Sequence, residues 1–104
     1  DALPIYRIYR STERRYESTD PSIQITNPVN GETYIMNPNK GAYEIELGAF
    51  SSLPIYEITW YVDGKEYDKV GPPYKTKWHL SRGIHTLTAV GPGHSGDSVE
   101  IEVR

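Results

Sequence analysis

The residues with the clearest potential for chemistry lie in the segment GPGHSG, residues 91–96. His94 and Ser95 in this segment and Asp97 directly after it are the three side-chain types of a nucleophilic triad. A triad is defined by spatial roles, which close sequence neighbours rarely achieve, and no elbow or oxyanion-hole motif accompanies these residues. We therefore expect turn-forming roles for Ser95 and Asp97 and no catalytic residue in this segment.

The same segment matches the spacing G-x-G-x-x-G of dinucleotide-binding loops. Such a loop needs a helix directly after the glycines, because the helix N-terminus holds the pyrophosphate. The residues that follow, DSVEIEVR, alternate between polar and apolar as a strand does. The sequence therefore predicts a loop between two strands and no bound cofactor.

A metal site is not predicted. The three histidines, none with a partner at the i+2 or i+4 spacing of a metal pair, are His79, His85 and His94. Asp63 and Asp97 are possible calcium ligands, but no acidic loop completes a coordination shell and both have sufficient roles in turns. The chain contains no cysteine, which excludes disulfides and thiolate metal sites.

The nine tyrosines and two tryptophans offer rings that stack on sugars or bases. Four aromatic residues share a predicted strand face with aliphatic residues and are therefore assigned to the core: Trp60, Tyr67, Tyr74 and Trp78. Tyr56 falls in the alternating row of Ile58, Trp60 and Val62 and is expected to face inward with them. Tyr61 is the outward-facing exception, and one ring does not make a platform. His85 falls on the face of Leu87 and Ala89, which indicates a structural histidine at or inside the sandwich edge. Three basic side chains form a small stripe that we expect to be a solvated face: Lys75, Lys77 and His79.

The elements that carry these residues are short strands. Alternating runs recur roughly every 8–14 residues with turn residues between them. Six runs have this pattern, 22–26, 43–47, 56–62, 74–80, 84–90 and 99–103, with a further strand after residue 64. About seven strands without an intervening helical stretch indicate an all-β fold, a small immunoglobulin-like β-sandwich.

Two turns are predicted in detail. Asp63-Gly64 favours a type I′ hairpin turn, because both central positions need a positive φ. That turn sets Val62 opposite Lys65, Tyr61 opposite Glu66, and Trp60 opposite Tyr67. Farther upstream, in TNPVNGETYIMNP (residues 26–38), we expect Asn27-Pro28 to end the first strand and Asn30-Gly31 to supply a positive-φ turn. Tyr34 and Met36 are then expected to face inward.

Composition limits the number of domains and the classes of partner. The chain has 104 residues, enough for one domain, and a net charge of −3 with both signs interspersed. This argues against nucleic-acid binding, and no segment approaches the ~20 apolar residues of a membrane span. Residues 1–20 are rich in Arg and Tyr, and we interpret them as a linker or tether from a preceding domain, with the sandwich domain at 21–104. The start at Asp1 indicates a processed or excised piece of a longer chain.

Four segments together match a known pattern: ITNPVNGETYIMNP (25–38), ITWYVDGK (58–65), WHLSRGIHTLTAV (78–90) and GDSVEIEVR (96–104). On these motifs the chain from Ser22 to Arg104 resembles the C-terminal domain of bacterial class A penicillin-binding proteins of the 1C type. Those proteins are periplasmic bifunctional peptidoglycan synthases. The catalytic motifs S-x-x-K, S-x-N and K-T-G do not occur here, so the resemblance carries no active-site residue over.

The resemblance implies a non-catalytic accessory domain beside a transglycosylase and transpeptidase, located outside the cytoplasmic membrane. Its expected partners are other domains of the parent synthase, and peptidoglycan or a periplasmic protein. The alternative is a free-standing immunoglobulin-like binding or adhesion module of a secreted bacterial protein, with carbohydrate as one candidate ligand. An upstream sequence that holds the catalytic motifs would distinguish the two.

Overall fold

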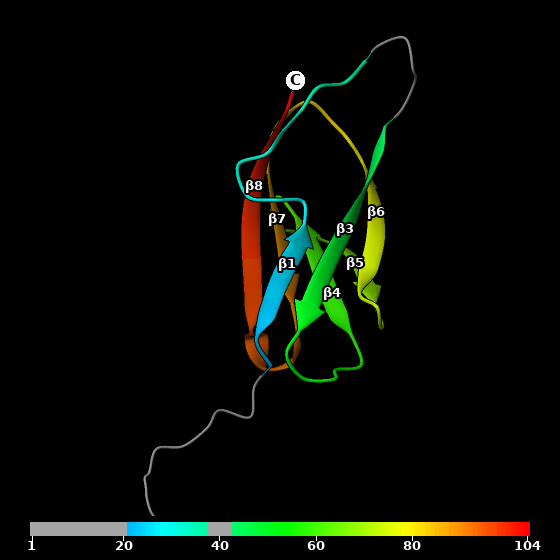
Figure 1. Ribbon diagram of the computed structural model, residues 1–104, viewed down its shortest axis with the longest axis vertical. Coiled ribbons are helices and arrows are strands. Elements are labelled where there is room, and N and C mark those ends of the chain that lie inside the picture. The colour runs from blue at the N-terminus through cyan, green and yellow to red at the C-terminus, as the bar shows by residue number, and fades with distance from the viewer. Residues whose placement is uncertain (1–20, 38–42) are drawn as a thin grey trace, which may run out of the picture.

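The computed structural model describes residues 21–37 and 43–104, which form two facing β-sheets (Figure 1). The first sheet contains, in spatial order, β1 (Ile23–Asn27), β3 (Glu44–Ser51) and β6 (Lys75–His79). The second contains β2 (Thr33–Tyr34), β8 (Gly96–Val103), β7 (Gly83–Val90), β4 (Ile58–Val62) and β5 (Lys65–Val70). The predicted all-β, immunoglobulin-like sandwich is confirmed. The predicted boundary after residue 20 adjoins residues outside the described ranges and stays a prediction.

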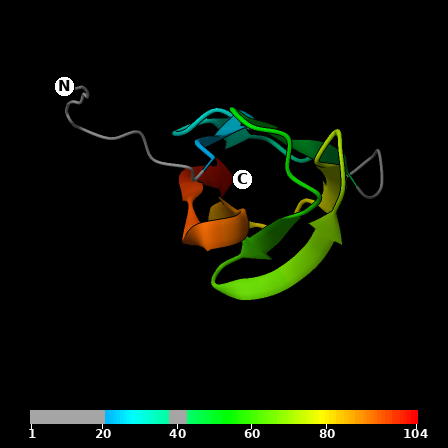
Figure 2. The same ribbon diagram turned by 90° about the horizontal axis from the view of Figure 1, so that it is seen from below.

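Figure 2 shows the two sheets facing each other, and the buried side chains of their strands form the core. Alternation along each strand points one side chain in two inward, so Leu47, Ile58 and Leu87 are completely buried. Trp60 and Trp78 join them, as predicted, with 0% and 8% of their surface exposed. Burial of these two rings alone removes a large apolar area from water, which makes them major contributors to stability.

The β4–β5 hairpin has the predicted turn but not the complete predicted register. Asp63 and Gly64 have φ values of 53° and 84°, and Val62 pairs with Lys65 as expected. A β-bulge then shifts the register, so that Trp60 lies opposite Asp68 and not opposite Tyr67.

The assignment of Tyr67 to the core is wrong for the same reason. The bulge leaves Tyr67 as the additional residue of β5, and 42% of it is exposed. Its hydroxyl donates a hydrogen bond to the carbonyl of Lys77 in β6. Thr76 of β6 also donates a hydrogen bond, over 2.7 Å, to the carboxylate of Asp68. Side chains of the hairpin therefore close one side of the sandwich, where Figure 2 shows β5 curving toward β6.

Asp97 closes the opposite side. Sequence reasoning gave it a turn role, but it lies in β8, and its Oδ2 accepts a hydrogen bond of 2.8 Å from the backbone N–H of Ile25 in β1. Its Oδ1 accepts a second hydrogen bond, of 2.9 Å, from the N–H of Ser98. The carboxylate thus satisfies a main-chain donor at the edge of the facing sheet, a contact that local sequence patterns do not reveal.

The segment from Val29 to Met36 covers the outer edge of β8. Its two-residue strand β2 runs parallel to β8, and Tyr34 and Met36 are half-buried against the core, as predicted. In the turn before β2, Gly31 alone carries the expected positive φ, of 85°. The main-chain N–H and C=O groups that this segment satisfies belong to Glu100 and Glu102 of β8 and to Arg104, which follows β8 directly.

Substitution of Asp97 tests the closure between β1 and β8. Asp97→Ala leaves the amide of Ile25 without its acceptor, so we expect the free energy of unfolding to fall by about 1–3 kcal/mol. Urea denaturation followed by tryptophan fluorescence measures this change. Glu57→Ala, which removes a carboxylate that forms no hydrogen bond with another described residue, is the control and is expected to stay within about 0.5 kcal/mol of the unmodified chain. An equally small effect of Asp97→Ala would contradict the role given to this carboxylate.

Candidate functional site

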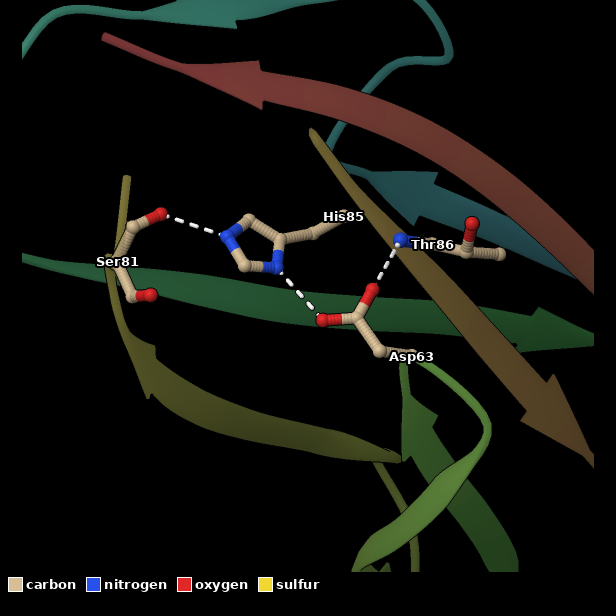
Figure 3. A network of polar contacts seen from close by, with 4 residues as sticks. All are labelled: Asp63, Ser81, His85 and Thr86. Carbon is tan, nitrogen blue, oxygen red and sulfur yellow. Dashed lines mark hydrogen bonds and ion pairs between the residues drawn. The ribbon is translucent and has the colours of Figure 1, made fainter. Parts of the chain in front are cut away.

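A polar network at one end of β7 connects the β4–β5 turn to the β6–β7 connection (Figure 3). His85 Nδ1 lies 2.7 Å from Asp63 Oδ2, and His85 Nε2 lies 2.7 Å from the carbonyl oxygen of Ser81. Asp63 Oδ1 accepts a hydrogen bond of 2.9 Å from the N–H of Thr86. The side chain of His85 is only 12% exposed and meets Trp78 edge to face, with ring centroids 5.0 Å apart.

These partners favour the charged form of His85. A carboxylate and a carbonyl can only accept, so both ring nitrogens are bonded at once only when both carry a proton. Burial lowers the pKa of His85, but the hydrogen bonds to Asp63 and Ser81 and the charge of Asp63 outweigh it, and the pKa rises above its ordinary 6.5. The hydrogen bond from His85 in turn holds the pKa of Asp63 below its usual 3.8.

The network contains Ser, His and Asp but does not form a nucleophilic triad. Ser81 contributes its main-chain carbonyl and not its hydroxyl. A histidine that donates from both nitrogens has no free lone pair with which to accept a proton from a nucleophile. The network is therefore suited to holding the hairpin, the β6–β7 connection and Trp78 in place.

The GPGHSG segment forms the connection between β7 and β8. One 3₁₀ turn, η1 (Pro92–His94), is followed directly by β8, and the N–H of Gly91 donates to the carbonyl of Ser95 over 2.8 Å. No α-helix follows the glycines, so the connection lacks the helix terminus that holds a pyrophosphate. The predicted loop between strands is confirmed, and the side chain of His94 lies outside what the structure describes.

The basic stripe on β6 is matched by acidic residues on β3. Lys75 lies 3.9 Å from Glu46, and His79 lies 3.2 Å from Glu44, with all four side chains largely exposed. Antiparallel pairing of β3 with β6 sets the two rows side by side. This face therefore carries mixed charge, which argues against a site for a polyanion. Within residues 21–37 and 43–104, no three His, Asp or Glu side chains group as metal ligands.

A shallow depression of about 280 Å³ lies on the outer face of the five-stranded sheet. We call it the tyrosine depression; its lining residues include Tyr56, Glu57, Thr59, Tyr61 and Lys69, and it extends to the start of the β7–β8 connection. Alternation along the chain into β4 places three of these on one face, and the pairing of β4 with β5 sets Lys69 beside Thr59.

Tyr56 was expected to continue the inward-facing row of β4, and this is wrong. The chain bends at Tyr56, two residues before β4 begins at Ile58, so the strand alternation does not reach it. Tyr56 is 79% exposed, and Ile55 packs partly against the core instead. The outer face therefore presents two rings where the sequence indicated one, and no firm signal in the sequence marks the bend that exposes the second.

The tyrosine hydroxyls separate into two groups. Those of Tyr34, Tyr67 and Tyr74 donate hydrogen bonds within the fold, to Glu32, Lys77 and Ile55. The hydroxyls of Tyr43, Tyr56 and Tyr61 bond to no other described residue, and of these three Tyr56 and Tyr61 line the depression. These two rings are thus not needed for the internal hydrogen bonding of the described fold.

The fold and these sites define an immunoglobulin-like β-sandwich module. It is similar to the fibronectin(III)-like modules of Clostridium thermocellum CbhA, with a TM-score of 0.63 and 22% identity over 81% of this chain and 46% of that one. It is also similar to an FMN-binding β-glucuronidase from F. prausnitzii L2-6, with a TM-score of 0.58 and 21% identity over 84% of this chain and 12% of that one. At these identities the likeness concerns the fold alone. This chain spans less than half the length of either structure.

The family is identified by sequence. Residues 12–103 match the model of the Penicillin-Binding Protein C-terminus Family, and the chain belongs to that family. The resemblance to a penicillin-binding protein C-terminal domain is thereby confirmed. No curated protein matches the chain. In residues 21–37 and 43–104, no helix has the length and apolar character to cross a membrane.

The protonation of His85 predicts a pH dependence of stability. The pKa of His85 is raised on folding, so its contribution is complete below the unfolded value of 6.5 and is lost as the pH rises through the folded value. We expect the free energy of unfolding to fall as the pH rises from about 6.5 through the raised pKa of His85, and His85→Gln to flatten this slope. Urea denaturation across that range measures it. His79→Gln, at an exposed position, should keep the slope, and an unchanged slope in His85→Gln would contradict the assignment.

Proposed function

We propose that this chain is a non-catalytic accessory domain of a penicillin-binding protein and acts in peptidoglycan synthesis outside the cytoplasmic membrane. The observation that carries the proposal is the family match over residues 12–103. The catalytic motifs of penicillin-binding enzymes, S-x-x-K, S-x-N and K-T-G, do not occur in the sequence. This favours an accessory role for this part of the parent protein.

The geometry of the described residues also favours binding over catalysis. The one histidine–carboxylate pair in a well-formed network, His85 with Asp63, is occupied on both nitrogens by acceptors of the fold. General base catalysis needs a free lone pair within reach of a substrate proton, and this pair does not offer one. A rigid sandwich with exposed side chains on its outer faces suits contact with the wall or with a partner protein.

The alternative, a free-standing adhesion module, shares the fold but not the family. The fibronectin(III)-like likeness is compatible with both proposals, because many unrelated functions use this sandwich. The family match favours the accessory domain. Its partners are then the other domains of the parent synthase, together with peptidoglycan or a periplasmic protein.

Labelling with fluorescent penicillin tests the proposal. We expect the parent protein to be acylated, the parent without this domain to be acylated as well, and the isolated chain to remain unlabelled. An excess of unlabelled penicillin is the control for specific acylation. Labelling of the isolated chain, or an upstream gene sequence without S-x-x-K and K-T-G motifs, would overturn the assignment.

A further inference from the structure

The tyrosine depression brings together groups of complementary chemistry. Two aromatic rings, from Tyr56 and Tyr61, offer apolar faces, and the hydroxyl of Thr59 and the carboxylate of Glu57 offer hydrogen bonds. None of these four side chains has a hydrogen bond or ion pair with another described residue. The polar groups of the depression are therefore available to a ligand.

The arrangement follows the strand. Glu57, Thr59 and Tyr61 occupy alternate positions, so they form a row along the outer face that includes β4. At about 3.3 Å per residue, the row is about 13 Å long, close to the length of two or three linked pyranose rings. Lys69 of β5 and Val90 of β7 pair with Thr59 on either side. The depression therefore extends across three neighbouring strands.

The charge of the depression gives it no strong preference for a charged ligand. It contains one carboxylate, of Glu57, and one ammonium group, of Lys69, whose Nζ lies 4.0 Å from Glu66. Such a balanced set attracts neither a polyanion nor a polycation strongly. Its volume of about 280 Å³ lies just below the usual range of small-molecule pockets, and its open shape suits an extended chain that lies on the surface.

A sugar chain satisfies these conditions together. The C–H groups on one face of a pyranose ring pack against a tyrosine ring, while its hydroxyl and amide groups bond to carboxylate, hydroxyl and ammonium groups at the rim. A peptide that adds a strand needs instead a free main-chain edge, and the Lys69–Thr59–Val90 row lies across paired strands. The face of the sheet thus favours a glycan over an added strand.

We propose that the tyrosine depression binds the glycan strand of the cell wall, a linear polymer of N-acetylated amino sugars, with Tyr56 and Tyr61 as the stacking residues. The identity of the polymer rests on the proposed function, whereas the sugar chemistry rests on the site. Glu57 and Thr59 form hydrogen bonds with the hydroxyl and amide groups of the bound rings, and Lys69 lies at the rim.

Binding to peptide-free glycan strands tests this inference. The strands are prepared from sacculi with an amidase that removes the stem peptides, and they are titrated into the 104-residue chain while its backbone amide resonances are followed by NMR. We expect saturable shifts confined to residues near 56–61, 69 and 90–92. The double variant Tyr56→Ala/Tyr61→Ala should lose about tenfold or more in affinity, because truncation of aromatic anchors removes their contact area.

Three further variants separate stacking from general surface effects and from loss of folding. Tyr56→Phe/Tyr61→Phe keeps the rings and should retain most of the affinity. Phe50→Ala removes an aromatic ring that is 56% exposed on the other sheet, and it should bind as the unmodified chain does. Tyr56→Ala alone changes a largely exposed side chain, so it tests the site even where the double variant unfolds.

The outcomes are decisive in both directions. Absence of binding, or binding that survives Tyr56→Ala and the double variant, overturns the inference. Binding to intact sacculi but not to peptide-free strands also overturns it, because the wall contact would then be made through stem peptides. None of these results bears on the accessory-domain assignment, which depends on the penicillin labelling.

Discussion

The carboxylate of Asp63 connects the β4–β5 turn to β7 and, through His85, to the opposite sheet. One oxygen fixes the β4–β5 turn to the main chain of β7, and the other bonds to His85. His85 reaches onward to Ser81 and lies edge-on against Trp78, which belongs to the opposite sheet. A single turn residue is thus connected to both layers. The turn joins β4, which carries Tyr61, to β5, which carries Lys69. The contacts that hold the turn therefore also help to position the outer face of the hairpin.

Trp60 shows how closely local pattern and global packing agree here. Its place in an alternating run predicts burial, and it is completely buried in β4, between β7 and β5 of the five-stranded sheet. The type I′ turn at Asp63-Gly64 was equally predictable, because few residues accept a positive φ at both positions. Such features depend on short-range geometry alone, and for this reason the fold class could be predicted from the sequence.

The residues that sequence reasoning misplaced depend on irregularities or distant partners. Tyr67 is displaced by a β-bulge, and Tyr56 by a bend before its strand, and neither leaves a firm local signal. Asp97 finds its partner, the amide of Ile25, 72 residues away. The candidate glycan site escaped prediction for the same reason, since alternation placed Tyr56 inside and left Tyr61 as a lone ring.

The Val29–Met36 segment that lies along β8 has a consequence for how such domains behave in a crowded compartment. An open strand edge invites pairing with another chain, and β8 would otherwise present one at the end of its sheet. Because β2 pairs with β8, the edge strand at that end of the sheet has only two residues. It offers little length for pairing with another chain. At the far boundary, β5 is bulged and rich in charge, with Lys65, Glu66, Asp68 and Lys69. Both ends of the five-stranded sheet are therefore poor templates for the addition of a strand from another copy.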